Sequence, residues 1–157
     1  MKKRNGESGQ AMILTLLSMT LLLGFVGFAA DVGVLLHLKR NLQTAADAAA
    51  IAGAAQLGYA DLTTQAAGQA AAAQNGVTNG VNGVVVAINS PPNGGAFAGD
   101  PAYVEAIVTQ PQQTIFANAF ATLFQGTSLS TMTVTARAVA TNVGAGCVYG
   151  LGTAGAG

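Results

Sequence analysis

The residues that could do chemistry are few and scattered in this sequence. Residues 150–155 read Gly-Leu-Gly-Thr-Ala-Gly and match the G-x-G-x-x-G dinucleotide-binding pattern letter for letter. That pattern works only after a strand and before a helix, within a βαβ unit, and two residues remain after Gly155. We interpret the match as a glycine-rich tail rather than a phosphate-binding loop.

Residues that could act as nucleophile, base or metal ligand also lack partners. The single His37 and the single Cys147 lie far apart, and no acid cluster near them would complete a catalytic pair or a metal site. Asp100 and Glu105 are the only acids after Asp61. We expect both to face solvent, Asp100 in a loop before a proline and Glu105 on the wet side of a strand. The sequence therefore predicts no enzyme, no cofactor, no metal and no small-molecule substrate.

Charge is scarce, and its placement argues against a nucleic-acid partner. Charged residues make up 8% of the 157 residues, the net charge is zero, and Arg137 is the only basic residue after Arg40. Binding to phosphates needs a basic face. Polar positions are mostly Thr, Gln and Asn, which suits an extracytoplasmic or assembled protein better than a free cytosolic enzyme. One cysteine excludes an internal disulfide.

The element that must position the rest is a long apolar segment. Residues 11–30 carry no charge, and the apolar character continues to Leu36 with Asp31 as the only charged interruption. About 20 apolar residues suffice to cross about 30 Å of hydrocarbon as a helix. No proline precedes Pro91, so nothing forces this helix to stop at the membrane surface. We expect one helix over residues 11–57, about 70 Å long, with its first half in lipid and Asp31 just beyond it.

The second half of that helix carries a stripe of apolar residues at alternating steps of three and four. The stripe consists of Leu35, Leu38, Leu42, Ala45, Ala49 and Ala52. Such spacing is typical of a helix face that meets a partner. We predict that the stripe is a close-packing surface for the sheet, for another subunit, or for both. Lys39, Gln43 and Asp47 form a polar ridge that we expect to face solvent.

The remaining sequence predicts two shorter helices. Asp61 can cap a helix over residues 62–74, closed by Asn75-Gly76. Its expected inner face is Leu62, Ala66, Ala70 and Ala73. Pro111 suits the start of another helix ending near Gly126, and its Phe116, Phe120 and Phe124 are expected to point into the core.

Strand signals separate these helices. Residues 84–88 and 103–109 are rich in strand-forming residues, and Pro91-Pro92-Asn93-Gly94-Gly95 marks the loop over residues 89–101 between them. Residues 129–141 alternate apolar and polar side chains, which indicates a strand covered on one face and wet on the other. The fold class is therefore α+β, with a long N-terminal helix carrying a small antiparallel sheet and one or two packed helices, a pilin-like plan.

Domain organisation follows from the span and the charges around it. Lys2, Lys3 and Arg4 are expected to keep the N-terminus cytoplasmic. Residues 1–10 are then a cytoplasmic tail, 11–57 the transmembrane and amphipathic helix, 58–143 an extracytoplasmic domain and 144–157 a glycine-rich tail. A cleaved secretory signal ending at Ala29, which would release a small secreted enzyme, is the competing interpretation.

Three motifs resemble a known family. They are Gly9-Gln10-Ala11, residues 23–33 with their Ala-x-Asp-Val-Gly ending, and residues 42–53 with Leu-Gln-Thr-Ala-Ala-Asp-Ala-Ala-Ala. Together they closely resemble the N-terminal domain of TadE/TadG-like proteins of the tight-adherence (Flp) pilus system. The resemblance covers about residues 9–57. It implies a non-catalytic, pseudopilin-like protein of the bacterial inner membrane, with the lipid bilayer and other pilus-assembly or pilin subunits as partners.

Two departures from pilin-type proteins limit this inference. Prepilin processing uses a glycine followed by a segment with Glu at its fifth position, whereas cleavage after Gly6 would put Ala11 there and cleavage after Gly9 would put Leu14 there. Processing is therefore not expected. Larger family members continue well past the position of Cys147, so a short member and a truncated copy both stay open. A membrane-anchored module that binds a surface ligand through residues 89–101 is the alternative function.

Overall fold

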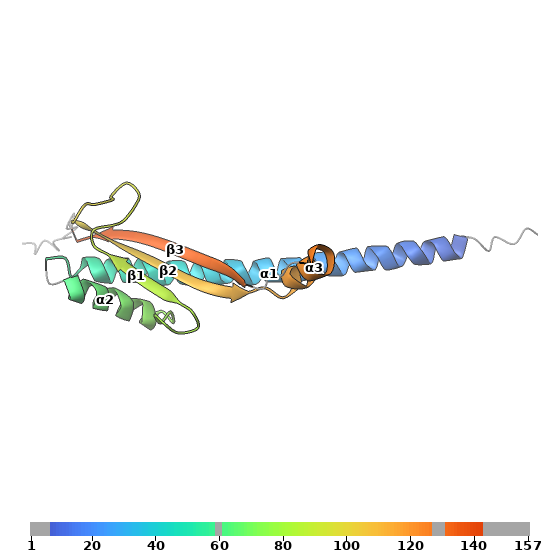
Figure 1. Ribbon diagram of the computed structural model, residues 1–157, viewed down its shortest axis with the longest axis horizontal. Coiled ribbons are helices and arrows are strands. Elements are labelled where there is room, and N and C mark those ends of the chain that lie inside the picture. Colours follow the sequence, from blue (N-terminus) through green and yellow to red (C-terminus); the bar gives the residue numbers. More distant parts are fainter. Residues whose placement is uncertain (1–6, 59–60, 127–130, 143–157) are drawn as a thin grey trace, which may run out of the picture.

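The computed structural model describes residues 7–58, 61–126 and 131–142. In these residues a very long helix, α1 (Glu7–Ala54), carries all the other elements (Figure 1). The three strands and α2 (Asp61–Gln74) lie along the C-terminal half of α1, whereas α3 (Phe116–Gln125) lies between them and the N-terminal half (Figure 1). The predicted α+β fold class is confirmed.

Helix α1 is continuous, as the lack of proline predicts, but it ends at Ala54 rather than near Leu57. Tight turns follow, with Gln56 N–H donating to Gly53 O and Leu57 N–H donating to Ala54 O, both at 3.0 Å. Gly58 then adopts a left-handed φ of 94°. By length and composition, α1 could cross a membrane.

Helix α2 begins at Asp61, one residue before the predicted start, and ends in a glycine motif as predicted. Val77 N–H donates to Ala72 O and Gly76 N–H donates to Ala73 O, each at 3.0 Å. Gly76 has a φ of 80°, which completes a Schellman cap. The cap turns the chain toward the sheet and buries Val77 there.

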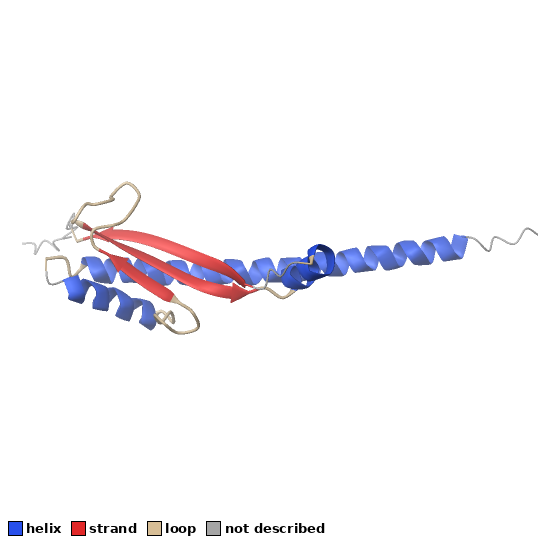
Figure 2. Ribbon diagram, in the orientation of Figure 1, coloured by secondary structure: helices blue, strands red, loops and turns tan. Residues whose placement is uncertain are grey.

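The sheet is antiparallel, with strand order β1-β2-β3. Its strands are β1 (Val85–Asn89), β2 (Tyr103–Gln113) and β3 (Thr131–Thr141). The register sets Val86 opposite Val108, and Val108 opposite Ala136. Figure 2 shows all three strands running beside α1. The strands are predicted to within a few residues, except that β2 is four residues longer than expected and residues 129–130 lie outside the described part.

Pro111 lies inside β2, so the expectation that it begins a helix is wrong. β2 pairs with β3 as far as Gln113, but β1 pairs only with residues 105–109 of β2. At Pro111, the β1 side of β2 therefore has no neighbouring strand, and a residue without an N–H is tolerated there. The proline ring packs over Gly83 instead.

The core lies between α1, α2 and one face of the sheet. Its α1 members are mostly alanines around Leu42, and its strand members include Val86, Val108 and Ala136. Alanines let the helix backbone approach the sheet closely, so a thin core still excludes water. The opposite face of the sheet is covered only in part, by the loop over residues 90–102, which we call the distal loop.

Candidate functional site

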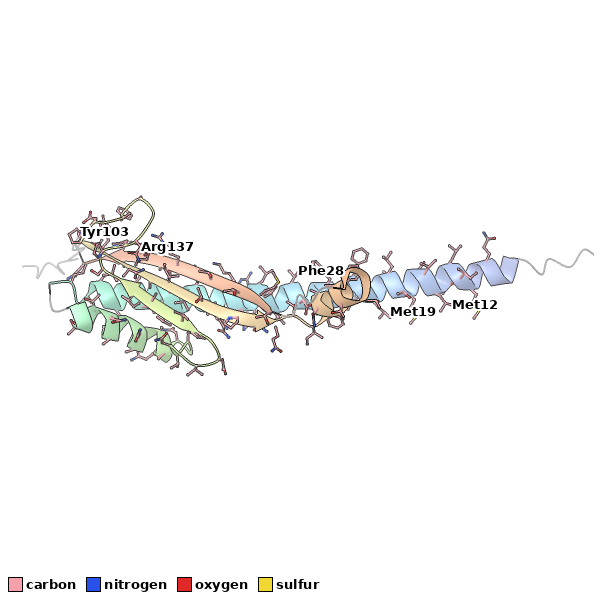
Figure 3. The ribbon with its side chains drawn as sticks, viewed as in Figure 1. Met12, Met19, Phe28, Tyr103 and Arg137 are labelled. Atoms are coloured by element: carbon pink, nitrogen blue, oxygen red, sulfur yellow. The ribbon has the colours of Figure 1, made fainter. Side chains whose placement is uncertain are left out.

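The N-terminal half of α1 is exposed over 18 consecutive residues. Residues 9–26, which we call the bare segment, are all exposed, and their side chains project on every side (Figure 3). At 1.5 Å per residue the bare segment is about 27 Å long, close to the thickness of a bilayer's hydrocarbon core. Its length and composition fit a membrane span.

The polar side chains of the bare segment are satisfied within the helix. Thr15, Ser18 and Thr20 each donate a hydroxyl hydrogen bond to the carbonyl four residues earlier, at 2.9, 2.8 and 2.9 Å. A hydroxyl left without a partner in hydrocarbon would cost several kcal/mol, roughly. These three bonds therefore make the segment compatible with lipid.

The structure brings the predicted stripe together beneath the sheet. Leu42, Ala45 and Ala49 are fully buried core residues. Leu38 packs against that core, while Leu35 and Ala52 are half-buried. The stripe thus meets the chain's own sheet, and its role toward another subunit stays a prediction.

The buried face of helix α2 is not the predicted inner face. Ala66, Ala70 and Ala73 are exposed, whereas Thr64, Gly68 and Ala72 are buried; the side chain of Leu62 lies outside the described residues. A Cβ on Gly68 would lie 3.1 Å from Ala49 O and 2.7 Å from Ile88 Cδ1. The prediction is wrong because close approach of the two helices, rather than side-chain size, selects the face.

The polar ridge of α1 is also not simply solvated. Lys39 Nζ donates to Thr135 O, and Gln43 Nε2 donates to Arg137 O at 3.2 Å and to Asp47 Oδ1 at 2.8 Å. These carbonyls belong to β3, an edge strand of the sheet. The ridge therefore occupies part of that edge, which could otherwise pair with another strand.

The other edge of the sheet is blocked in the same way. Val86 in β1 donates its N–H to Asn79 Oδ1 at 2.9 Å, and its carbonyl accepts a hydrogen bond from Gln69 Nε2 at 3.2 Å. Side chains thus satisfy backbone groups on both outer strands. This arrangement disfavours strand addition at these positions, and favours helices as the means of contact with other chains.

Asp31 joins the end of the membrane-compatible region to α3. Its Oδ1 accepts a hydrogen bond from Ile115 N at 3.2 Å, and its Oδ2 accepts one from Ala117 N at 2.8 Å. The first N–H groups of a helix lack partners within the helix, and Ile115 itself provides no capping side chain. Asp31, expected to be an interfacial acid, is therefore a buried N-terminal cap supplied by a distant helix. A single acid after an uncharged apolar segment was the one signal for it.

The phenylalanines of α3 do not form a core, so that prediction is wrong. Phe116 is 48% exposed and Phe120 is 60% exposed; the side chain of Phe124 lies outside the described residues. The buried face of α3 centres on Ala121 instead. The ring of Phe116 lies over Gly27, where an added Cβ would come within 2.3 Å of it. Helix α3 thus packs against α1 at the end of the bare segment and turns large apolar groups outward.

Glu105 is buried, so the expectation that it faces solvent is wrong. Only 1% of its surface is accessible. Its Oε2 accepts hydrogen bonds from Asn89 Nδ2 at 2.9 Å and from Asn93 N at 3.0 Å, and its Oε1 pairs with Arg137 Nε. Arg137 also donates to Gly94 O at 2.5 Å. The distal loop therefore folds over the outer face of the sheet and covers Glu105, while the side chain of Arg137 stays 42% exposed.

The surroundings of Glu105 favour its ionised form. Burial alone would raise the pKa of its carboxyl. The hydrogen bonds from Asn93 N–H, Asn89 and Arg137, together with the charge of Arg137, outweigh burial and hold the pKa below its ordinary value of 4.5. Such a carboxylate is an acceptor that fixes a loop, not an acid poised to give up a proton near neutral pH.

The remaining groups named by the sequence that the structure describes, Asp100 and His37, do not meet in a reactive site. Asp100 lies in the distal loop as expected, and its Oδ1 accepts a hydrogen bond from Ala102 N at 2.9 Å. His37 contacts Asn41 at 3.2 Å. Within the described residues, no group of three or more His, Cys, Asp or Glu side chains could hold a metal ion. Cys147 and the glycine pattern at residues 150–155 lie outside the described residues.

A shallow groove of about 290 Å³ lies between α1 and the C-terminal part of β3. Asp47, Ala50 and Ile51 of α1 line one wall, and residues 138–140 of β3 line the other. Ile51 is exposed. The groove offers a small apolar surface with a single acid, which suits contact with another chain better than binding of a polar substrate.

The N-terminal part of the chain matches a protein family. Residues 9–56 match the family model described as "Putative Flp pilus-assembly TadE/G-like". The match covers α1 from Gly9 onward and the start of the turn after it, and it confirms the resemblance seen in the sequence. No curated protein and no solved structure matches the chain significantly.

Proposed function

With residues 9–56 identified as a TadE/G-like segment of the Flp pilus-assembly family, we propose that the chain is a single-pass membrane protein that acts, without catalysis, in the assembly of Flp (tight-adherence) pili. Its partners are the lipid bilayer and other pilus-assembly or pilin subunits. It needs no cofactor, because its work is done by packing surfaces. In this proposal the chain keeps the organisation expected from its sequence: a cytoplasmic tail, a transmembrane and amphipathic helix, an extracytoplasmic domain and a glycine-rich tail.

One observation carries the proposal: α1 runs unbroken from the bare segment into the core under the sheet. Any force or contact on the sheet is therefore transmitted to the membrane-compatible part through a rigid helix rather than a linker. A pseudopilin-like subunit is built on the same plan, with an apolar helix that can pass from lipid into contact with neighbouring helices. The capped sheet edges favour helix contacts over strand exchange as the mode of assembly.

The membrane in question is the bacterial inner membrane, with the N-terminus in the cytoplasm. Lys2, Lys3 and Arg4 precede the bare segment and outnumber Lys39 and Arg40 on its other side. Basic residues near a span stay cytoplasmic. The sheet and both shorter helices are then extracytoplasmic.

The distal loop supports a second candidate function, binding of a surface ligand by an anchored module. Phe97 is partly exposed and stacks on Tyr103, with ring centroids 4.1 Å apart. The ion pair of Glu105 and Arg137 holds the loop in place. A fixed loop with an exposed aromatic ring at the far end of the rod could contact a ligand.

Two exposed apolar residues separate these functions. Ile51→Lys places a charge on the groove beside β3, one turn after Asp47, a helix pairing that should preserve the fold. Phe97→Ser removes the exposed ring of the distal loop. Val81→Lys, at an exposed apolar position before β1, is the matched control for Ile51→Lys.

The experiment is complementation of a gene deletion, with membrane abundance, surface filaments and adherence measured for each variant. The assembly function predicts that Ile51→Lys is normally abundant but yields few filaments, while Phe97→Ser and Val81→Lys behave like wild type. The ligand-binding function predicts normal filaments throughout and loss of adherence with Phe97→Ser alone. Normal filaments after deletion of the gene would contradict the assembly function.

A further inference from the structure

Helix α3 presents an apolar face whose large side chains are mostly exposed. Ile115, Phe116, Phe120 and Leu123 are exposed, Leu123 to 78% and Ile115 to 73%. In helical projection, Phe116, Phe120 and Leu123 share one face, opposite buried Ala121. At the start of that face the ring of Phe116 also touches α1, over Gly27. No charged residue occurs between Thr114 and Gly126. A face of this kind in a monomeric protein requires an explanation.

The position of α3 along α1 indicates what covers that face. The bare segment ends at Val26, and the next two buried residues of α1, Gly27 and Asp31, are the ones that contact α3. If the bare segment crosses the hydrocarbon core, α3 lies at the boundary between hydrocarbon and water on the side of the sheet. Figure 1 shows α3 between the sheet and the bare half of α1.

We infer that α3 is a second membrane contact, an amphipathic helix that lies in the lipid interface beside the span and inserts its apolar face among the acyl chains. The chemistry is that of interfacial helices, in which apolar residues are buried about 5–10 Å into the headgroup boundary. The inference rests on the membrane-spanning part of the proposed function. It adds that the span and α3 form one unit that fixes the depth of the rod.

Asp31 makes such a position possible. A carboxylate near hydrocarbon is costly unless its oxygens are hydrogen-bonded. Here both oxygens accept hydrogen bonds from backbone N–H groups at the start of α3. The carboxylate therefore has two donors, and these N–H groups have an acceptor that the helix itself does not provide. Because Gly27 has no side chain, the Phe116 ring can lie directly on the α1 backbone. This contact keeps α3 against the span.

A depth measurement on the full chain tests the inference. The single cysteine is removed by Cys147→Ser, and a fluorophore sensitive to nitroxide quenching is attached through Leu123→Cys on α3, Leu17→Cys in the bare segment, or Val81→Cys before β1. All three positions are exposed, so the label should not disturb packing. The protein is reconstituted in vesicles of phosphatidylethanolamine and phosphatidylglycerol that carry a nitroxide either near the glycerol or near the acyl-chain end.

The expected result is greater loss of fluorescence at position 123 with the shallow nitroxide than with the deep one, the reverse at position 17, and no loss at position 81. Quenching at position 17 without quenching at position 123 would overturn the inference and leave the anchor intact. The same result with a disulfide between two copies at position 123 would assign the face to a second copy instead. Absence of quenching at position 17 would refute the membrane span itself, and the inference with it.

Discussion

The carboxylate of Asp31 accepts a hydrogen bond from the backbone N–H of Ala117 at 2.8 Å, joining two residues 86 positions apart. The contact ties α1, just after the bare segment, to the start of α3, with α2, β1 and β2 lying between the two residues in sequence. It belongs to the Ala-x-Asp-Val-Gly motif that carries part of the family resemblance. A residue of the N-terminal family segment thus positions an element that lies outside the matched region.

Asp31→Ala should loosen α3 without disturbing the sheet. The variant removes both acceptors, and loss of a helix cap costs about 1 kcal/mol. Hydrogen exchange of amides 116–125 in detergent micelles should become faster, while exchange in β2 and β3 stays unchanged. Asp47→Ala, which removes an exposed acid of the same helix, is the control. Equal exchange of α3 in all three proteins would show that the cap does not hold it.

Glu105→Gln should release the distal loop at neutral pH. The variant loses the ionic partner of Arg137 and places an N–H donor near other donors, a change worth about 1–3 kcal/mol for a buried group. Limited proteolysis should cut within residues 90–102 sooner than in wild type. Asp100→Asn, in the same loop but exposed, should leave the rate of cleavage unchanged.

The stability that Glu105 contributes should depend on pH in a defined direction. Its folded pKa lies below the ordinary value of 4.5, so its contribution is complete above that value and is lost as pH falls through the folded pKa. Glutamine does not titrate at this position. In urea denaturation across an acidic pH series, the gap in unfolding free energy between wild type and Glu105→Gln should narrow below pH 4.5. A constant gap would contradict the assignment.

Features set by local sequence could be predicted for this chain. The unbroken α1 follows from a long apolar segment without proline, and β3 follows from the alternation that puts Ala136 inside. The buried stripe around Leu42 follows from helical periodicity. In each case the signal and the structure it produces lie in the same stretch of sequence.

Features set by distant partners could not be predicted. Glu105 alternates as an outward residue, and only the distal loop folding over it makes that position buried. Pro111 is predicted to start a helix because the sequence does not reveal that β1 pairs only with residues 105–109 of β2, which leaves room for a proline at position 111. Phe116 and Phe120 have core spacing, but the environment of α3 is decided by where Asp31 and Gly27 hold it along α1.

Two glycine substitutions should have opposite effects on stability. Gly68→Ala brings a methyl group against Ala49 O and Ile88, and overpacking of this kind costs about 1–3 kcal/mol. Gly33→Ala meets nothing within 4 Å, and replacing a helical glycine there should gain about 0.5–1 kcal/mol. Thermal unfolding in detergent should therefore give a lower Tm for the first variant and an equal or higher Tm for the second. A higher Tm for both would mean that α2 does not depend on close approach to α1.

The last prediction concerns retention and orientation of the span. Because the bare segment continues into the folded rod without a break, the mature protein should keep it, resist extraction by alkaline carbonate and show by intact mass no species beginning at Ala30. An alkaline phosphatase fused after Asn142 should be active, since Lys2, Lys3 and Arg4 hold the other end in the cytoplasm. The control is the same fusion with those three residues changed to glutamine, which leaves Lys39 and Arg40 to decide and should lower phosphatase activity. An inactive fusion in the unaltered chain, with a cytoplasmic reporter active at the same point, would reverse the topology and place the sheet, α3 and the distal loop inside the cell.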